Sequence, residues 1–304
     1  MNERGLLVGG RFLLGEIIGR GGMGVIHAAQ GQHDGQPYAV KLLRAADGVD
    51  SMARRRFARE ASNALRISHP NAVRTFAVGE QPDYAWMAME FVHGRSLHQW
   101  VESEGRCDPV VAAAWIRQLA DVLSHVHDIG IVHRDVKPSN VMVSGSGASA
   151  HLRLLDFGLA RDVENAAHEI TRDGRAAGTP GFMAPEQRLG LPADARADVF
   201  SLAALAAFIL AARMPVAAWA KPLATRMFGR RRRWPESVDA VLSGALAPDP
   251  RQRTAGVTTF AADFEEAVKD RGWAEGKPLV YWKRDPASDI GSNAARSETM
   301  DLDG

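Results

Sequence analysis

The chain has 304 residues, with 37 basic and 36 acidic side chains and a formal net charge of +1. This balance excludes the strongly cationic surface expected of a general nucleic-acid binder, so we expect no nucleic-acid partner. A hydrophobic fraction of 46% beside 24% charged residues is typical of globular proteins, and the length corresponds to roughly two domains.

The first third of the chain alternates short β-prone segments with glycine and polar turns. One helix is expected among them, with Ser51 as its N-cap and the His69-Pro70 pair as its stop. The expected strands cover residues 12–18, 25–27, 38–43, 75–78 and 84–90. This part of the chain is therefore predicted to form a small, β-rich unit with one helix.

Beyond residue 91 the segments become longer, helical and rich in alanine and leucine. The expected helices cover residues 110–127, 199–212, 237–246 and 257–268. The apolar run at residues 199–212 is shorter than the roughly 20 residues that span a bilayer, so we predict a buried helix there. The fold class is therefore α+β, with a β-rich first lobe and a mostly helical second lobe.

Two segments lack a clear pattern. Residues 215–235 are irregular and carry an arginine run at 230–233, for which a solvated charge run is a simpler interpretation than a docking site for an acidic partner. From residue 273 onward the sequence offers too little apolar surface to offset the entropy of ordering. Residues 273–304 are therefore predicted to be a disordered tail.

The sequence predicts a soluble, cytoplasmic protein. The chain does not begin with a basic segment followed by an apolar core and a cleavage site, so we expect no export signal. No apolar segment is long enough to span a membrane. The single cysteine, Cys107, cannot form an intramolecular disulfide, which fits a reducing compartment.

Phosphate chemistry is first indicated by the sequence GRGGMG at residues 19–24, which lies between two strand-like segments. Such a hairpin brings backbone amides close to phosphate oxygens, although a plain glycine-rich hairpin explains these residues equally well. Lys41 lies at the end of an apolar strand, and Glu60 on the next helix could hold its ammonium group. By themselves, these two residues are better explained as an edge lysine and a surface glutamate.

The most specific pattern consists of three motifs. Residues 133–140 read HRDVKPSN, residues 156–158 read DFG and residues 184–186 read APE. In this order and at this spacing, the set resembles the eukaryotic-type (Hanks-type) protein kinases. The resemblance is strongest to the bacterial serine/threonine kinases, because Lys137 follows Asp135 by two residues and the glycine loop is fully filled.

The resemblance implies a bilobal protein kinase domain at residues 12–272, with the N-lobe at about 12–91 and the C-lobe at about 92–272. It implies transfer of the γ-phosphate of ATP to Ser/Thr hydroxyls of proteins in bacterial signalling, with Mg²⁺ as cofactor. It also implies autophosphorylation, for which a homodimer would form. Hydroxyl groups in the tail are expected autophosphorylation sites: Ser288, Ser292, Ser297 and Thr299.

By the same resemblance, five residues form the catalytic set. Asp135 accepts the proton of the substrate hydroxyl, Lys137 neutralises the transferring phosphate, and Thr179 positions the acceptor beside them. Lys41, oriented by Glu60, contacts the α- and β-phosphates.

The metal and the nucleotide have further expected ligands. Asn140 and Asp156 are the expected metal ligands, because Mg²⁺ prefers carboxylate and amide oxygens. Met89 takes the gatekeeper position before the hinge, which favours a role at the nucleotide over plain core packing. The residues expected to surround adenine or cover the phosphates are Ile18, Gly19, Gly21, Gly22, Gly24, Ile26, Ala39, Lys41, Met89, Glu90, Val92 and Met142.

Regulation is indicated by Arg134, which precedes the catalytic aspartate. In the resembled family this pattern implies an activation segment ordered by phosphorylation, since a phosphothreonine adds about −1.5 to −2 charges that pair with arginine. Thr171 is the expected phosphosite. The alternative is a segment that is ordered without modification.

Other matches imply structural roles. Glu186 and Arg253 are expected to form a buried ion pair in the second lobe, and Asp198 is expected to anchor the backbone of the HRD motif. Leu154 and Leu155 fit a buried strand under the site. None of these residues is expected to take part in the chemistry.

The sequence also departs from the family pattern. Ala212 stands where glycine is usual and Val216 where an aromatic residue is common. The chain from there to Pro235 is shorter than typical, so substrate preference is the least transferable inference. His125, His127 and His133 lack the accompanying ligands of a zinc site, so structural roles are expected for them.

Two other functions are compatible with a kinase fold. An ATP-binding pseudokinase scaffold is the main alternative, but such scaffolds usually lose one of the residues equivalent to Lys41, Asp135, Asn140 and Asp156, all present here. A small-molecule phosphotransferase is disfavoured, because those enzymes generally lack the DFG and APE motifs with a segment between them.

Overall fold

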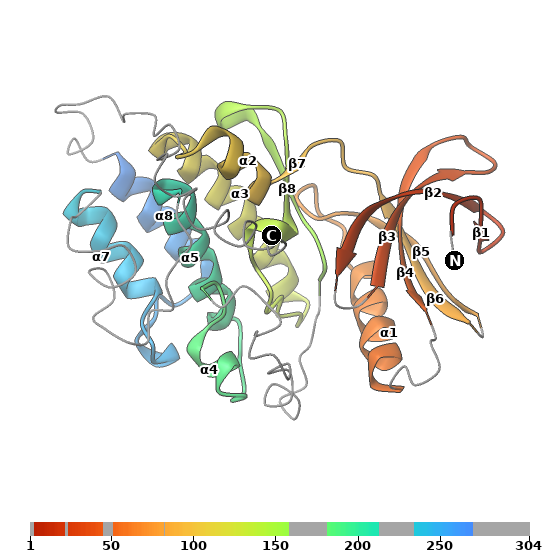
Figure 1. Ribbon diagram of the computed structural model, residues 1–304. Coiled ribbons are helices and arrows are strands. Elements are labelled where there is room, and N and C mark those ends of the chain that lie inside the picture. The colour runs from red at the N-terminus through yellow and green to blue at the C-terminus, as the bar shows by residue number, and fades with distance from the viewer. Residues whose placement is uncertain are drawn as a thin grey trace, which may run out of the picture.

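A computed structural model describes residues 3–21, 24–44, 51–81, 83–157, 181–212 and 234–269. Figure 1 shows two lobes, one built around a curved sheet with a single helix and the other mostly helical. The predicted α+β bilobal fold is therefore confirmed. Residues 213–233, with Val216 and the arginine run, and the tail from residue 270 lie outside the described residues.

The first lobe is a six-stranded antiparallel sheet in the order β1-β2-β3-β4-β6-β5. The strands are β1 (Leu7–Val8), β2 (Phe12–Gly21), β3 (Gly24–Gly31), β4 (Pro37–Arg44), β5 (Thr75–Gln81) and β6 (Tyr84–Glu90). The five predicted strands are confirmed, most of them longer than predicted. β1 was not predicted, because two residues are too few to produce an alternating pattern.

Both faces of this sheet are covered. Along β4, Ala39 and Leu43 join a cluster with Phe57 of the helix α1 (Ser51–Leu65), whereas Val40 and Leu42 pack on the opposite face. Successive side chains of a strand point to opposite faces, so a strand covered on both sides is apolar throughout. The predicted helix is confirmed, but Ser51 is its first residue rather than the residue before it.

The second lobe contains the longer helices and a small sheet in the order β7-β8-β9. The helices are α2 (Leu97–Glu104), α3 (Pro109–Asp128), α4 (Pro185–Arg188), α5 (Arg196–Ala211), α7 (Glu236–Ala245) and α8 (Val257–Val268). The strands are β7 (Arg95–Ser96), β8 (Val141–Ser144) and β9 (His151–Leu154). The four predicted helices are confirmed, and α2, α4, β7 and β8 are additions.

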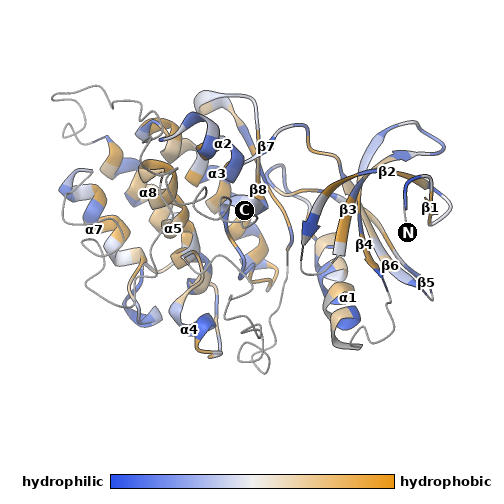
Figure 2. Cartoon of the chain, in the orientation of Figure 1, coloured by the Kyte–Doolittle hydropathy of each residue, from blue (hydrophilic) through white to orange (hydrophobic). Residues whose placement is uncertain are grey.

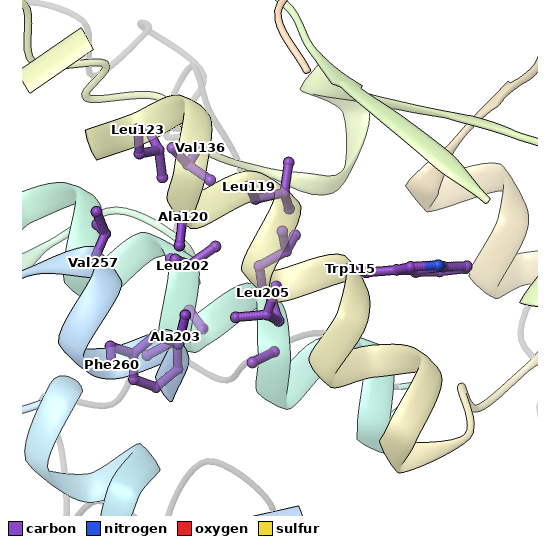
Figure 3. Close-up of a cluster of buried hydrophobic side chains, with 14 of the residues drawn as sticks. Trp115, Leu119, Ala120, Leu123, Val136, Leu202, Ala203, Leu205, Val257 and Phe260 are labelled. Carbon is purple, nitrogen blue, oxygen red and sulfur yellow. The ribbon is translucent and has the colours of Figure 1, made fainter. Parts of the chain in front are cut away.

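The core of the second lobe lies where α3, α5 and α8 meet (Figure 3). The residues of α5 from Ala197 to Ala211 are all buried, as expected for a helix that is apolar on every side. Figure 2 accordingly shows α5 as the most uniformly hydrophobic helix and α7 with a hydrophilic outer face. Among the described residues, no helix is long and apolar enough to cross a membrane.

The connection between α1 and β5 joins the two lobes. The Asn71 side chain donates to Gln118 Oε1 of α3 at 2.9 Å and to the Leu152 carbonyl of β9 at 2.8 Å. The Val73 amide donates to the Leu154 carbonyl at 3.0 Å, and the Leu154 amide donates to the Asn71 carbonyl at 2.8 Å. α1 is therefore fixed at one end against the second lobe, which determines where its polar residues face the site.

Candidate active site

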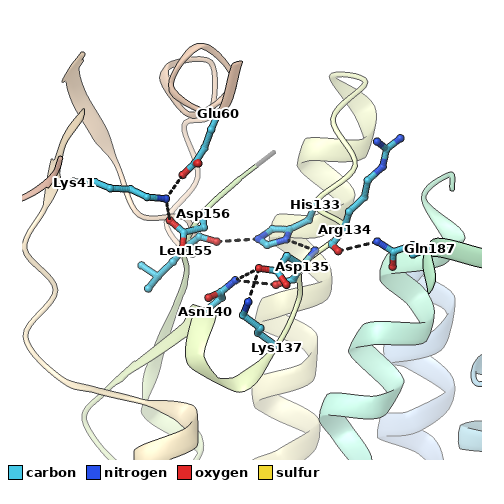
Figure 4. Close-up of polar contacts among 10 residues, drawn as sticks. All are labelled: Lys41, Glu60, His133, Arg134, Asp135, Lys137, Asn140, Leu155, Asp156 and Gln187. Carbon is cyan, nitrogen blue, oxygen red and sulfur yellow. Dashed lines mark hydrogen bonds and ion pairs between the residues drawn. The ribbon is translucent and has the colours of Figure 1, made fainter. Parts of the chain in front are cut away.

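Lys41 and Glu60 meet between β4 and α1 (Figure 4). The Lys41 ammonium donates to Glu60 Oε1 at 2.6 Å, and both residues are buried. Burial would lower the pKa of Lys41, but the carboxylates of Asp156 and Glu60 outweigh burial and raise it. Burial raises the pKa of Glu60 to about 7, with Asp156 acting in the same direction and Lys41 opposing. The ammonium is therefore held as a cation, as expected from the sequence.

Asp156 approaches the same ammonium from the second lobe. Its Oδ1 accepts a hydrogen bond from Lys41 Nζ at 3.1 Å. Burial would raise the pKa of Asp156, but the positive charge of Lys41 lowers it below the ordinary value. The residue adopts a left-handed backbone conformation with φ of +56°, which is strained for a residue other than glycine. Fixed, charged carboxylates of this kind concentrate at functional sites.

Asp135, Lys137 and Asn140 form the second part of the site, on the chain between α3 and β8. Lys137 Nζ donates to Asp135 Oδ2 at 2.7 Å. The Asn140 amide nitrogen donates to the Asp135 carbonyl oxygen at 2.9 Å and to Oδ2 at 3.0 Å. A short 3₁₀ turn at Pro138–Asn140 returns the chain toward Asp135. The three predicted residues are thus brought together, with the Asp135 carboxylate between a cation and an amide.

The backbone that carries Asp135 is held by buried hydrogen bonds. Asp198 accepts from the backbone amides of His133 at 2.8 Å and Arg134 at 2.7 Å, which confirms the predicted anchor. His133 Nδ1 accepts from the Asp135 amide at 3.2 Å, so its Nε2 donates to the Leu155 carbonyl at 2.9 Å. The HRD segment is therefore joined directly to the segment that carries Asp156.

Two contacts of this anchor were not predicted. His127 Nε2 lies 2.7 Å from Asp198 Oδ2, so this histidine has the structural role expected of it. Gln187 donates to the Arg134 carbonyl at 2.8 Å. No motif signals either contact, because the partners are more than 50 residues apart in the sequence. Within the described parts of the chain, no cluster of three or more histidine, cysteine or acidic side chains could hold a metal.

The glycine-rich segment is a hairpin between β2 and β3, as the sequence predicts. Gly19 pairs with Ile26, and Gly21 pairs with Gly24 across the hairpin. Gly24 has φ of +132°, and a Cβ atom there would lie 2.2 Å from the Leu42 carbonyl oxygen, so only glycine fits. Gly22 lies outside the described residues.

Four of the residues expected around adenine belong to one apolar cluster. Ala39 and Met89 are register partners on β4 and β6, and Ile26 and Val92 pack against the same cluster. Ile18 is half exposed on β2, and Met142 lies on β8 in the second lobe.

The structure adds an interaction at the end of β6. The Glu90 carboxylate forms an ion pair with Arg153 of β9 at 3.0 Å, which joins the two lobes beside the connection between them. The sequence gives no signal for this pair.

Besides Gly22, three more expected residues fall outside the described residues: Thr171, Thr179 and Gly158 of the DFG motif. Their positions in the site therefore stay predictions.

The Glu186–Arg253 ion pair is confirmed, with both Arg253 terminal nitrogens 2.6 Å from the Glu186 oxygens.

The donors of the site fit a magnesium nucleotide. The Asn140 nitrogen is turned toward Asp135, so its amide oxygen points away from that carboxylate, and the Asp156 carboxylate lies across from it (Figure 4). Carboxylate and amide oxygens are ligands that Mg²⁺ prefers. The Lys41 ammonium adds a point charge of the kind that binds phosphate oxygens. The residues present are therefore chemically suited to both groups.

Comparisons with known proteins agree with this geometry. The protein kinase domain family matches residues 12–264. The chain is 33% identical over 276 residues to a probable serine/threonine-protein kinase of Corynebacterium efficiens, covering 85% of this chain and 41% of that relative. It is 34% identical over 267 residues to the serine/threonine-protein kinase PknB of Mycobacterium tuberculosis, covering 84% of this chain and 42% of that relative. The chain thus spans about two fifths of the length of these relatives.

Solved structures give the same result. The kinase domain of Mycobacterium tuberculosis PknI matches with a TM-score of 0.70 and 28% identity, covering 88% of this chain and 99% of that one. A structure of Rad53 in complex with AMP-PNP has a TM-score of 0.65 at 22% identity, covers 84% of this chain and 65% of that one, and shows the fold alone. On the family match and these relatives, the chain belongs to the protein kinase family, with bacterial serine/threonine kinases among its relatives.

Proposed function

We propose that this chain is an active serine/threonine protein kinase that transfers the γ-phosphate of ATP to Ser/Thr hydroxyls of proteins. The observation that carries the proposal is that Lys41, Glu60, Asp135, Asn140 and Asp156 form two polar clusters at the junction of the lobes (Figure 4). Phosphoryl transfer requires mainly positioning and charge neutralisation from a protein, and these residues offer both.

The first cluster would hold the phosphates. Lys41 would bind the α- and β-phosphate oxygens, and Glu60 would hold its flexible side chain in place. The backbone of Gly19, Gly21 and Gly24, with Gly22 between them, would close over the phosphates without side-chain obstruction.

Mg²⁺ would be held by the oxygens of Asn140 and Asp156, and it would neutralise phosphate charge when bound. Adenine would lie against Ile18, Ile26, Ala39, Met89 and Met142, with the backbone of Glu90 and Val92 reading its edge.

The second cluster would act on the acceptor. Asp135 would accept the hydroxyl proton and align the oxygen, since its carboxylate is fixed by Lys137 and Asn140. Lys137 would turn toward the transferring phosphate once substrate is bound. Thr179 is proposed to hydrogen-bond beside them and position the acceptor.

Phosphorylation at Thr171 is proposed to order the activation segment through Arg134. The Arg134 guanidinium donates to the Ala193 carbonyl at 3.0 Å, and its buried Nε has no hydrogen-bond partner among the described residues. A phosphate could accept hydrogen bonds from this group. Autophosphorylation within a transient homodimer is proposed as its source, with the tail hydroxyls as further sites.

The proposed catalytic domain covers residues 12–272, followed by a disordered tail at 273–304. Its proposed compartment is the cytoplasm, which is supported by Cys107 being buried with a free thiol.

The test is phosphate transfer from radiolabelled ATP with Mg²⁺, followed by mapping of the labelled residues. Asp135→Asn should lower the rate at least about a hundredfold, the range typical of a lost general base. Asp263→Asn, which removes an exposed carboxylate on α8, is the matched control and should keep the wild-type rate. Equal labelling by wild type and Asp135→Asn would overturn the proposal. Nucleotide binding without labelling by either would favour the scaffold.

A further inference from the structure

The chain before residue 12, where the family match begins, is an integral part of the first lobe. The Gly5 amide donates to the Leu14 carbonyl at 2.8 Å, and the Leu14 amide donates to the Leu6 carbonyl at 2.9 Å. Val8 of β1 is fully buried in the cluster on the face of the sheet opposite α1. These contacts bring the side chain of Glu3 over β3 and β4.

Glu3 binds two side chains of this sheet at once. Its Oε2 lies 2.7 Å from His27 Nε2, and its Oε1 accepts a hydrogen bond from Arg44 Nε. Burial would raise the pKa of Glu3, but the hydrogen bonds with His27 and Arg44 outweigh burial and lower it. Glu3 is therefore a charged carboxylate between two basic groups.

His27 has a second partner on β2. Its Nδ1 lies 3.3 Å from the Gly15 carbonyl oxygen, at the point where the pairing of β2 and β3 shifts register between Leu14 and Ile17. Both ring nitrogens of this buried side chain thus face oxygen atoms, with the Glu3 carboxylate at Nε2 and the Gly15 carbonyl at Nδ1. His27 pairs with Glu3, which in turn binds Arg44. His27 thereby links Glu3 to the backbone of β2 at its register shift.

The strands joined in this way carry the phosphate-binding elements of the site. β2 and β3 are the two arms of the glycine hairpin, and His27 is the register partner of Val40 on β4. Arg44 ends the same strand three residues after Lys41. One cluster, on the face away from α1, therefore connects both arms of the hairpin to the strand of the phosphate-binding lysine.

We propose that Glu3 is a positioning residue, which through His27 and Arg44 fixes the glycine hairpin relative to Lys41 and thereby sets the affinity for ATP. The proposal rests on the proposed kinase function. It predicts an effect on ATP binding rather than on phosphate transfer, because none of the three side chains lies in the site.

The main variant is Glu3→Gln in the full chain, which keeps the shape of the side chain and removes its charge. The matched control is Glu16→Gln on β2. The Glu16 side chain is 76% exposed, and its ion pair with Arg4 is long, at 3.6 Å. We expect Glu3→Gln to raise the KM for ATP about fivefold to tenfold, as the partial loss of a charge-assisted hydrogen bond would, and to leave kcat within about twofold. KM for ATP and kcat would be measured with a protein substrate, at a temperature where melting curves show that each variant is folded.

His27→Gln is the second variant of the experiment. If the cluster acts as a unit, His27→Gln should raise the KM by a similar factor, and the double variant should add little. Hydrogen–deuterium exchange of the nucleotide-free chain should show faster exchange in β2 and β3 for Glu3→Gln but not for Glu16→Gln.

Unchanged exchange in the hairpin, or a Glu3→Gln KM equal to that of Glu16→Gln, would overturn the inference. A wild type without phosphate transfer, but with faster hairpin exchange in Glu3→Gln, would instead contradict the proposed function and leave the positioning role standing.

Discussion

Each lobe contains a buried ion pair, and the two pairs are built differently. Arg253 and Glu186 in the second lobe form a bidentate ion pair, with both N···O distances at 2.6 Å. Arg253 also donates to the carbonyls of Ala247, Arg196 and Pro248, at 2.7 to 3.1 Å. Every nitrogen of the guanidinium therefore has a partner within the lobe.

The pair in the first lobe is incomplete. Lys41 donates to one oxygen of Glu60, and the other oxygen is buried with no hydrogen-bond partner among the described residues. The ammonium is shared with Asp156 of the other lobe, so its position depends on how the lobes meet. An unmet buried polar atom costs free energy, which natural folds tolerate mainly where function requires it.

The difference separates what holds the fold from what serves the chemistry. A fully bonded pair has nothing left to offer a ligand and acts as a structural cross-link. A partly bonded pair that spans two lobes retains a donor for phosphate and responds to lobe position. The completeness of hydrogen bonding, rather than burial or charge, is what distinguishes Arg253 from Lys41.

The largest expected effect comes from breaking the complete pair. Arg253→Met should lower the free energy of unfolding by about 3–5 kcal/mol, because the buried Glu186 carboxylate loses its partner. Urea denaturation would measure the loss. Arg251→Met changes an exposed arginine of the same turn and should cost little by comparison. A loss no larger than that of Arg251→Met would contradict the structural role of the pair.

Breaking the incomplete pair of Lys41 and Glu60 should change stability less but should lower activity strongly. Lys41→Met should change the free energy of unfolding by less than about 1 kcal/mol, because the Glu60 pKa is already raised to about 7 and the carboxyl can take up a proton. Phosphate transfer should nevertheless fall at least about a hundredfold, as when a preorganised charge is removed.

Urea denaturation and a radiolabelled ATP assay would be run on the same preparation. Lys269→Met, on an exposed lysine, is the control and should change neither quantity. Unfolding of Lys41→Met under conditions where the control is folded would show that this pair, too, is structural.

The sequence predicted which polar residues meet better than it predicted the contacts that hold them in place. The HRD, DFG and glycine-loop motifs predicted which residues meet, because each motif keeps its members close along the chain, and the structure brings Asp135, Lys137 and Asn140 together accordingly. The pairs Glu3–His27 and Glu90–Arg153 left no local pattern, because their partners are 24 or more residues apart. Such contacts depend on the folded topology, so a single sequence does not reveal them.

Element length decided which parts of the fold could be predicted. Strands of seven residues or more and the long helices have a periodic pattern, and all of them were predicted. β1 and β7 have two residues each, and α2 has eight, so their patterns were too short to recognise. Ala212 was noted only as a departure from the family pattern, and the structure gives that departure a physical meaning.

Backbone strain extends the comparison between functional and structural regions. Among the described residues, positive φ occurs at three residues other than glycine: Arg134, Asp156 and Ala212. The first two lie in the site, where strain helps to fix the polar groups. Ala212, with φ of +51°, ends α5 and donates its amide to the Phe208 carbonyl at 2.8 Å, far from any catalytic group.

The smallest expected effect therefore comes from Ala212→Gly. Glycine adopts the left-handed conformation without the steric cost of a Cβ atom, so this change should raise the free energy of unfolding by about 0.5–1 kcal/mol and leave phosphate transfer unchanged. The neighbouring Ala211→Gly, at the last residue of α5, should instead lower it by up to about 1 kcal/mol, because glycine is the poorer helix former. Urea denaturation of the two variants should thus give shifts of opposite sign, and equal losses would show that left-handed strain at Ala212 has no energetic weight.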